Sequence, residues 1–247
     1  MSQAEIVTIR CLRDNYAYLL HAAGRTALFD APEAAPVLAV LRKRGWGLDQ
    51  ILLTHHHDDH IQAVPELVAA TGARVTGARA DAHRLPPLDH AAEAGEIIAV
   101  AGLDAHVIDV SGHTVGHIAF HLPAADAVFT GDSLMALGCG RIFEGDAAMM
   151  WDSLRRLDAL PADTLICSGH DYCAGNGAFA LSVDPDNAAL QARLRDIAAA
   201  ARPCAPATLE QERATNPFLR AGLLAAALGL KDAGAAFARL RKMKDDF

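Results

Sequence analysis

The stretch Leu52-Leu53-Thr54-His55-His56-His57-Asp58-Asp59-His60 lies where an apolar run gives way to four histidines and two aspartates. Burying so many polar groups without partners would cost roughly 2–7 kcal/mol for each group. In an extended segment alternate side chains leave the same side, so His55 and His57 point together, and Asp59 and His60 follow where the chain turns into a helix. The H-x-H-x-D-H spacing directly after a strand therefore predicts metal binding, with a solvated polar turn as the alternative.

Three later points supply donors of the same kind, and each follows an expected strand. They are His113 after residues 106–110, Asp132 after 127–129 and His170 after 164–167. The donors then divide into His55, His57 and His113 for one metal and Asp59, His60 and His170 for the other, with Asp132 as the bridge. Three protein ligands and a bridge at each ion leave room for a shared water, as expected of a catalytic site.

The rest of the chain predicts an α/β fold followed by helices. Short apolar runs with turn residues between them predict strands over residues 6–9, 16–20, 26–29, 50–53, 73–76, 97–101, 106–110, 117–121, 127–129 and 164–167. Helical spacing of apolar residues appears over 35–44, 61–70, 147–157, 187–201, 209–214, 217–228 and 233–241. We therefore expect a catalytic domain over residues 1–170 and a helical substrate-binding domain over 171–247.

Composition narrows the class of protein. The net charge of −8 does not favour nucleic acid as a partner. Five cysteines without a regular spacing indicate a reducing compartment rather than a disulfide framework. The N-terminus lacks the pattern of a signal peptide, and no apolar run has membrane-spanning length. A soluble, cytoplasmic monomer without a membrane partner is the expectation.

The donor set resembles that of the metallo-β-lactamase superfamily, whose fold is an αβ/βα sandwich. More narrowly, the chain resembles glyoxalase II, the hydroxyacylglutathione hydrolases. The segments that carry this narrower resemblance are Thr54–His57, Gly131-Asp132-Ser133-Leu134, Gly138-Cys139-Gly140-Arg141-Ile142-Phe143-Glu144-Gly145, Gly169-His170-Asp171-Tyr172 and Asn216-Pro217-Phe218-Leu219-Arg220. The resemblance implies the sandwich with a C-terminal helical domain.

The resemblance also implies a substrate site in an otherwise acidic chain. Arg241 and Lys244 match the positions that hold the glycine carboxylate of glutathione, and Arg141, Phe143 and Tyr172 match its other contacts. From the sequence alone, basic residues at the end of a helix equally complement its dipole, by about 0.3–1 kcal/mol each. Arg141 and Phe143 stand where some members of the family carry Lys and Tyr, which would remove one hydroxyl contact to glutathione.

These observations predict a metal-dependent thioester hydrolase. A hydroxide bridging two divalent ions would attack the thioester carbonyl, with Asp59 and Asp132 positioning it. Zinc is the expected metal, and iron and manganese accept the same donors. The expected reaction is hydrolysis of S-(R)-lactoylglutathione and related 2-hydroxyacylglutathione thioesters, as in methylglyoxal degradation. A glutathione persulfide dioxygenase with a single iron and a non-catalytic module that binds metal or glutathione are the alternatives.

Overall fold

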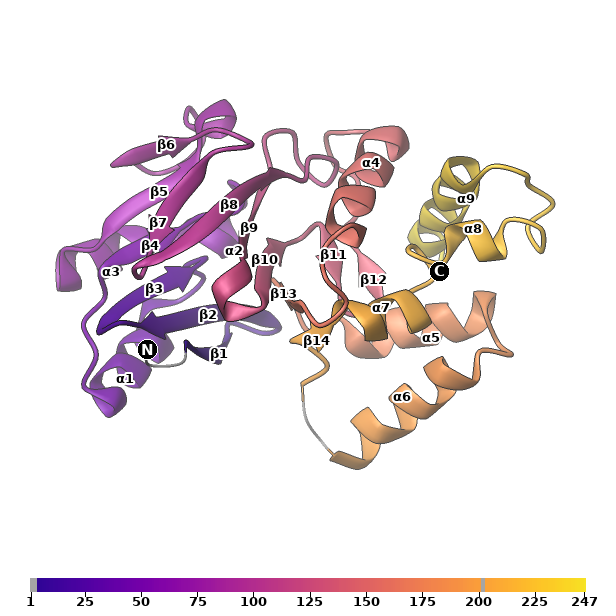
Figure 1. The fold of residues 1–247 in the computed structure, drawn as a ribbon, viewed down its shortest axis with the longest axis horizontal. Coiled ribbons are helices and arrows are strands. Elements are labelled where there is room, and N and C mark those ends of the chain that lie inside the picture. Colours follow the sequence, from indigo (N-terminus) through magenta and orange to yellow (C-terminus); the bar gives the residue numbers. More distant parts are fainter. Residues whose placement is uncertain (1–3, 201–202) are drawn as a thin grey trace. The chain divides into compact units, whose positions relative to one another are not determined.

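The computed structural model describes residues 4–200 and 203–247 (Figure 1). Its contacts divide the chain into two compact units. The first unit takes in the chain up to Asp109 and adds Gly116–Gly131, and the second consists of Val110–Val115 and Asp132–Phe247. Each unit is described by itself.

The first unit contains a mixed sheet whose strands follow one another in sequence order. Its members are β1 (Glu5–Cys11), β2 (Asn15–Ala22), β3 (Arg25–Phe29), β4 (Gln50–Leu52), β5 (Arg74–Ala78) and β6 (His90–Ala92). β1, β2 and β3 are antiparallel neighbours, and β3 to β6 are parallel. Parallel neighbours require crossover connections, and helices α1 (Ala34–Arg44) and α3 (Val64–Thr71) lie in two of them.

Helices α1 and α3 cover one face of this sheet. Their apolar residues Val37, Leu41, Val64 and Leu67 belong to the same buried cluster as Ile51 of β4. Gly45 and Gly72 end the two helices with φ angles of 68° and 72°, the left-handed conformation that glycine adopts without steric cost. The helical layer therefore follows from the apolar spacing and from the position of the two glycines.

The opposite face of the sheet packs on a second group of strands. These are β7 (Ile97–Val100), β8 (Leu103–Asp109), β9 (Ile118–Leu122) and β10 (Ala127–Gly131), each antiparallel to the next. Phe29 of β3 stacks on Phe129 of β10 with ring centroids 3.4 Å apart, and lies 5.8 Å from Phe120 of β9. All three rings are buried, so the two groups of strands share an aromatic core.

The second unit is mainly helical. Its helices are α4 (Ala147–Asp158), α5 (Cys173–Val183), α6 (Ala188–Ala200), α7 (Leu209–Thr215), α8 (Ala221–Leu224) and α9 (Ala233–Asp245), and its strands are β11 (Leu134–Met135), β12 (Gly138–Cys139), β13 (Leu165–Ser168) and β14 (Ala207–Thr208). Aromatic contacts join the helices: Phe237 of α9 stacks on Trp151 of α4 and meets Phe218 edge-on. Among the residues that the structure describes, no helix is long and apolar enough to cross a lipid bilayer.

Several elements differ from the sequence-based expectation. α5 was not predicted, because its sequence contains Gly175 and Gly177, which are unfavourable in helices. The expected helix over 217–228 is confined to α8, and the helix over 61–70 is divided into α2 (Asp58–Ile61) and α3. The short strands β6 and β14 were also not predicted. Residue 201 of the expected helix over 187–201 lies outside the described residues.

The cysteines also differ from the expectation. Cys173, the first residue of α5, forms a disulfide with Cys204 across 31 residues of sequence. This pairing was not predicted, because the spacing of cysteines in the sequence does not show which of them meet in the fold. The remaining cysteines, Cys11, Cys139 and Cys167, are buried thiols.

This pairing predicts the result of a thiol titration. In denaturant without reductant, an aromatic disulfide reagent should detect three thiols per chain, and after reduction it should detect five. In the native protein the reaction should be slow, because burial raises the pKa of Cys11 to about 12 and also raises those of Cys139 and Cys167. Five thiols before reduction would contradict the disulfide, and a Cys173→Ser variant should show four.

Candidate metal centre

The histidine turn of the first unit follows β4 and leads into α2. His57 precedes the first residue of α2, and Asp59 and His60 belong to the helix. The Nε2 atom of His55 lies 3.1 Å from Nδ1 of His57, and the His55 and His60 rings are 4.2 Å apart between centroids. Oδ2 of Asp59 is 3.8 Å from Nε2 of His60. The structure therefore brings together the four donors predicted in this stretch.

Asp30, which follows β3, holds this turn. Its Oδ1 accepts a hydrogen bond from the backbone N–H of Thr54 at 2.8 Å, and its Oδ2 accepts bonds from Oγ1 of Thr54 at 2.9 Å and Nδ1 of His60 at 2.8 Å. Oγ1 of Thr54 in turn lies 3.0 Å from Nδ1 of His55. Because Nδ1 of both histidines is used in this way, Nε2 is the ring nitrogen left to face a metal.

The role of Asp30 was missed in the sequence, where it looked like an ordinary residue at the end of a strand. Its φ of 57° is uncommon for a residue other than glycine. The side chain of Asn15 also supports the donors of this turn, because its Nδ2 donates to Oδ2 of Asp59 at 2.9 Å. An aspartate directly after an apolar strand was the available signal, but nothing in the sequence links it to residues 54–60.

The second unit brings together the other three predicted donors. Oδ2 of Asp132 lies 3.5 Å from Nε2 of His113 and 3.3 Å from Nε2 of His170. Nδ1 of His113 lies 2.6 Å from the carbonyl oxygen of Arg141, which fixes this ring as well with Nε2 towards the carboxylate. All three side chains are nearly buried. Gly140 is required beside them, because a Cβ there would overlap the carbonyl oxygen of Asp132.

The chemistry of these donors fits divalent metal ions. Within each unit the ring nitrogens and carboxylate oxygens point at one another. Two unprotonated ring nitrogens, or a ring nitrogen and a carboxylate oxygen, are both acceptors, so they gain nothing from this approach unless a proton or a cation lies between them. Neutral imidazole and carboxylate are the usual ligands of zinc, iron and manganese in proteins.

Two of the predicted substrate residues lie against the donors of the second unit. The ring of Tyr172 stacks on that of His170, with centroids 4.6 Å apart and planes 7° apart. The ring of Phe143 meets His113 edge-on at 5.3 Å. Both aromatic side chains are exposed, so each can contact a bound molecule.

The basic residues of α9 have contacts within the second unit. Arg241 is buried: its Nη1 donates to the carbonyl oxygen of Cys139 at 2.8 Å and its Nη2 to Oδ1 of Asp245 at 3.1 Å. Oδ1 of Asp245 also accepts from Nε of Arg141 at 3.3 Å. In the structure, then, Arg241 holds the chain just before Arg141.

Lys244 is less buried than Arg241, and its pKa is lowered. Its Nζ donates to the carbonyl oxygen of Gly175 at 3.0 Å, which leaves an ammonium group two further donors. Partial burial, followed by the positive charges of Arg241 and Arg141, lowers the pKa of Lys244, while Asp245 opposes this effect. An anion bound beside Lys244 would relieve the repulsion between these cations.

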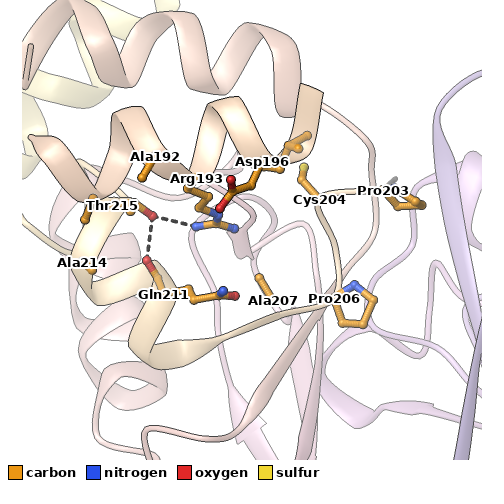
Figure 2. Close-up of a pocket in the computed structure, with 12 residues that line it drawn as sticks. Ala192, Arg193, Asp196, Pro203, Cys204, Pro206, Ala207, Gln211, Ala214 and Thr215 are labelled. Carbon is orange, nitrogen blue, oxygen red and sulfur yellow. Dashed lines mark hydrogen bonds between the residues drawn. The ribbon is translucent and has the colours of Figure 1, made fainter. Parts of the chain in front are cut away.

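A cavity of about 390 Å³ in the second unit is separate from the predicted site residues (Figure 2). It is lined by residues of α6 and α7 and by the segment from Pro203 to Ala207. In Figure 2 the guanidinium of Arg193 points towards Thr215, and its Nη1 donates to Oγ1 of that residue at 2.6 Å.

Comparison with known families assigns the chain. Residues 12–170 match the model of the metallo-beta-lactamase superfamily, and residues 171–247 match the model of the hydroxyacylglutathione hydrolase C-terminus. A hydroxyacylglutathione hydrolase of Fuscovulum blasticum is 61% identical over 98% of both chains. The chain belongs to the hydroxyacylglutathione hydrolase family. A second member, from Jannaschia sp. strain CCS1, is 57% identical over the whole of both chains.

Solved structures share the fold of this chain. ETHE1 from Myxococcus xanthus is 26% identical, with a TM-score of 0.66 over 95% of this chain and 89% of that one. TTHA1623 in a di-iron-bound form is 30% identical, with a TM-score of 0.59 over 67% of this chain and 91% of that one. The predicted glyoxalase II resemblance, the α/β sandwich with a C-terminal helical part, and the class of metal-dependent hydrolase are confirmed.

Proposed function

We propose that this protein hydrolyses S-(R)-lactoylglutathione and related 2-hydroxyacylglutathione thioesters to the hydroxy acid and glutathione, in the detoxification of methylglyoxal. The identity of 61% to a hydroxyacylglutathione hydrolase over 98% of both chains carries this proposal. A helical C-terminal segment that matches this family's own model supports the same substrate class.

The seven donors, together, are proposed to hold two divalent metal ions. One ion is assigned to His55, His57 and His113, the other to Asp59, His60 and His170, and Asp132 is assigned to both. The grouping of donors within each unit, with Nδ1 of His55, His60 and His113 held by hydrogen bonds, supports the proposal. A relative of 30% identity has been solved in a di-iron-bound form, and zinc is our proposal for the metal here.

Bound metals supply the acidity that turns water into a nucleophile near neutral pH and the positive charge that polarises a carbonyl oxygen. The residues of the chain orient the reaction. Asp59, held by Asn15, and Asp132, between His113 and His170, position the attacking water. A thiolate leaves readily, so no side chain has to act as a strong general acid.

The glutathione part of the substrate is assigned to Arg141, Phe143, Tyr172, Arg241 and Lys244. Tyr172 and Phe143 offer exposed rings beside His170 and His113. Lys244 provides an ammonium group for a carboxylate, and Arg241 contributes by holding the backbone at Cys139 and Gly140. We also propose a domain division at residue 170, where the two family models meet, and a monomer that works in the cytoplasm.

The test of the function is direct. Purified protein loaded with zinc should release a thiol from S-(R)-lactoylglutathione, detected with an aromatic disulfide reagent, and a chelator should stop the reaction. Absence of thiol release from the zinc-loaded protein would overturn the proposal. Oxygen uptake with glutathione persulfide and one iron per chain would instead favour a dioxygenase.

Replacing Lys244 with alanine is expected to raise KM for the thioester about tenfold and to change kcat less than twofold, because a charge-assisted hydrogen bond that binds the ground state and the transition state equally is lost. As pH rises, Lys244 loses its charge and the wild-type KM should increase. Because the pKa of Lys244 is lowered, this increase should begin at a lower pH than it would with an ordinary lysine. Lys231→Ala, at an exposed position, is the control and should leave KM unchanged. An unchanged KM in Lys244→Ala would remove this residue from the site.

A further inference from the structure

Asp81 is a fully buried aspartate that none of the site assignments uses. It is the last residue of a short 3₁₀ turn, Arg79–Asp81, which follows β5. Its Oδ2 lies 2.8 Å from Nδ1 of His56, and its Oδ1 lies 2.5 Å from Nε of Arg84. A buried carboxylate needs partners of this kind, because burying an unpaired charge is costly.

His56 is the residue between the donors His55 and His57. Its ring lies edge-on to theirs, at 78° to the ring of His55 and 67° to the ring of His57, with centroids 6.5 and 5.1 Å away. A carboxylate only accepts hydrogen bonds, so Nδ1 of His56 is the donor in this pair. The bond to Asp81 therefore fixes the orientation of His56 and, through the two peptide bonds that flank it, the backbone on which both donors are carried.

Asp81 supports the same turn from a second direction. Gly116 has a φ of 92°, and a Cβ on it would lie 3.1 Å from the Cβ of Asp81, so this backbone passes close to the aspartate. The next residue, His117, is fully buried, and its ring stacks on that of His55 with centroids 4.6 Å apart and planes 11° apart. Asp81 thus touches both the residue between the two donors and the segment that carries the ring packed on His55.

We propose that Asp81 is a positioning residue for the metal donors His55 and His57, which acts through His56 and through the Gly116–His117 segment. It sets the affinity with which these donors bind a divalent ion. The inference rests on the proposed function in one respect, that His55 and His57 are metal ligands. Balancing charge alone does not require the contact with His56, because Arg84 already pairs with Asp81.

The experiment measures the zinc affinity of the metal-free protein by competition with a chromogenic chelator. Asp81→Asn and His56→Ala should each lower the affinity for one of the two zinc ions by about 10–100-fold. This is the usual effect of removing a partner of a metal ligand. The double variant should bind zinc no more weakly than Asp81→Asn alone, because His56 acts only through its bond to Asp81. His56→Ala retains the Asp81–Arg84 pair, so it tests the proposal even where Asp81→Asn fails to fold.

The matched control is Asp49→Asn, in the same unit. Oδ2 of Asp49 accepts a hydrogen bond from the backbone N–H of Thr26 at 2.8 Å, so this change also removes a carboxylate that supports the backbone. It should lower the midpoint of thermal unfolding without changing zinc affinity. Wild-type zinc affinity in folded His56→Ala and Asp81→Asn would overturn the inference, whereas a wild-type protein that binds no zinc would overturn the proposed function instead.

Discussion

Replacing Asp132 with alanine is expected to lower kcat for thioester hydrolysis about a thousandfold or more, equivalent to about 4 kcal/mol of activation free energy. Oδ2 of Asp132 lies within 3.5 Å of Nε2 of both His113 and His170, so one carboxylate serves both histidines of the second unit. Removing a partner of a metal ligand lowers metal affinity or activity about 10–100-fold, and loss of Asp132, which is proposed to bind both ions, should lower it more. Steady-state kinetics and metal analysis of the same sample measure the effect.

Asp163→Ala is the matched control for this experiment, because Asp163 is an exposed aspartate of the same unit. It should retain wild-type kcat and metal content. Circular dichroism should show that Asp132→Ala remains folded, since the change removes a charge from among the donors rather than from the apolar core. Hydrolysis at the wild-type rate by Asp132→Ala would exclude the proposed role of this residue.

The largest expected effect on stability comes from Glu212→Ala, which should lower the free energy of unfolding by about 3–5 kcal/mol. Glu212 is fully buried in α7, and its Oε1 lies 2.5 Å from Nη2 of Arg193 in α6. Its Oε2 accepts hydrogen bonds from the backbone N–H of Leu137 at 2.9 Å and from Nδ2 of Asn216 at 3.0 Å. The alanine variant leaves a nearly buried guanidinium without its carboxylate, and urea unfolding measures the loss.

The neighbouring variant Glu210→Ala, at an exposed position of the same helix, should change the free energy of unfolding by less than about 0.5 kcal/mol. Combining Glu212→Ala with Arg193→Met should recover part of the loss, because the unpaired charge is then also removed. A loss below about 1 kcal/mol in Glu212→Ala would show that water reaches Arg193 and replaces its partner.

The donors could be predicted from the sequence because their pattern is local. His55, His57, Asp59 and His60 lie within six positions after an apolar strand, and His113, Asp132 and His170 each follow a strand as well. Alternation along a strand and the turn into a helix are enough to place such residues together. Their assignment to two particular metals goes beyond these local patterns and stays a prediction.

The residues that support the donors could not be predicted, because their contacts join distant parts of the sequence. Asp30 binds His60 across 30 positions, and Asp81 binds His56 across 25. A buried aspartate and an exposed turn aspartate look alike in a single sequence. Helix α5 was missed for a different reason: its glycines lower helix propensity, and tertiary packing overrides a weak propensity.

The hydrogen bonds of Asp30 bear on whether the protein folds before or after it binds metal. They connect the end of β3 to Thr54 and His60 entirely through atoms of the polypeptide, so the chain itself positions the proposed metal donors of this turn. Folding can then come first and ion uptake afterwards, unlike in small zinc fingers, where the ion drives folding. Stripping by a chelator should accordingly be reversible, and one batch of polypeptide can be charged in turn with different transition metals to compare their reactivity.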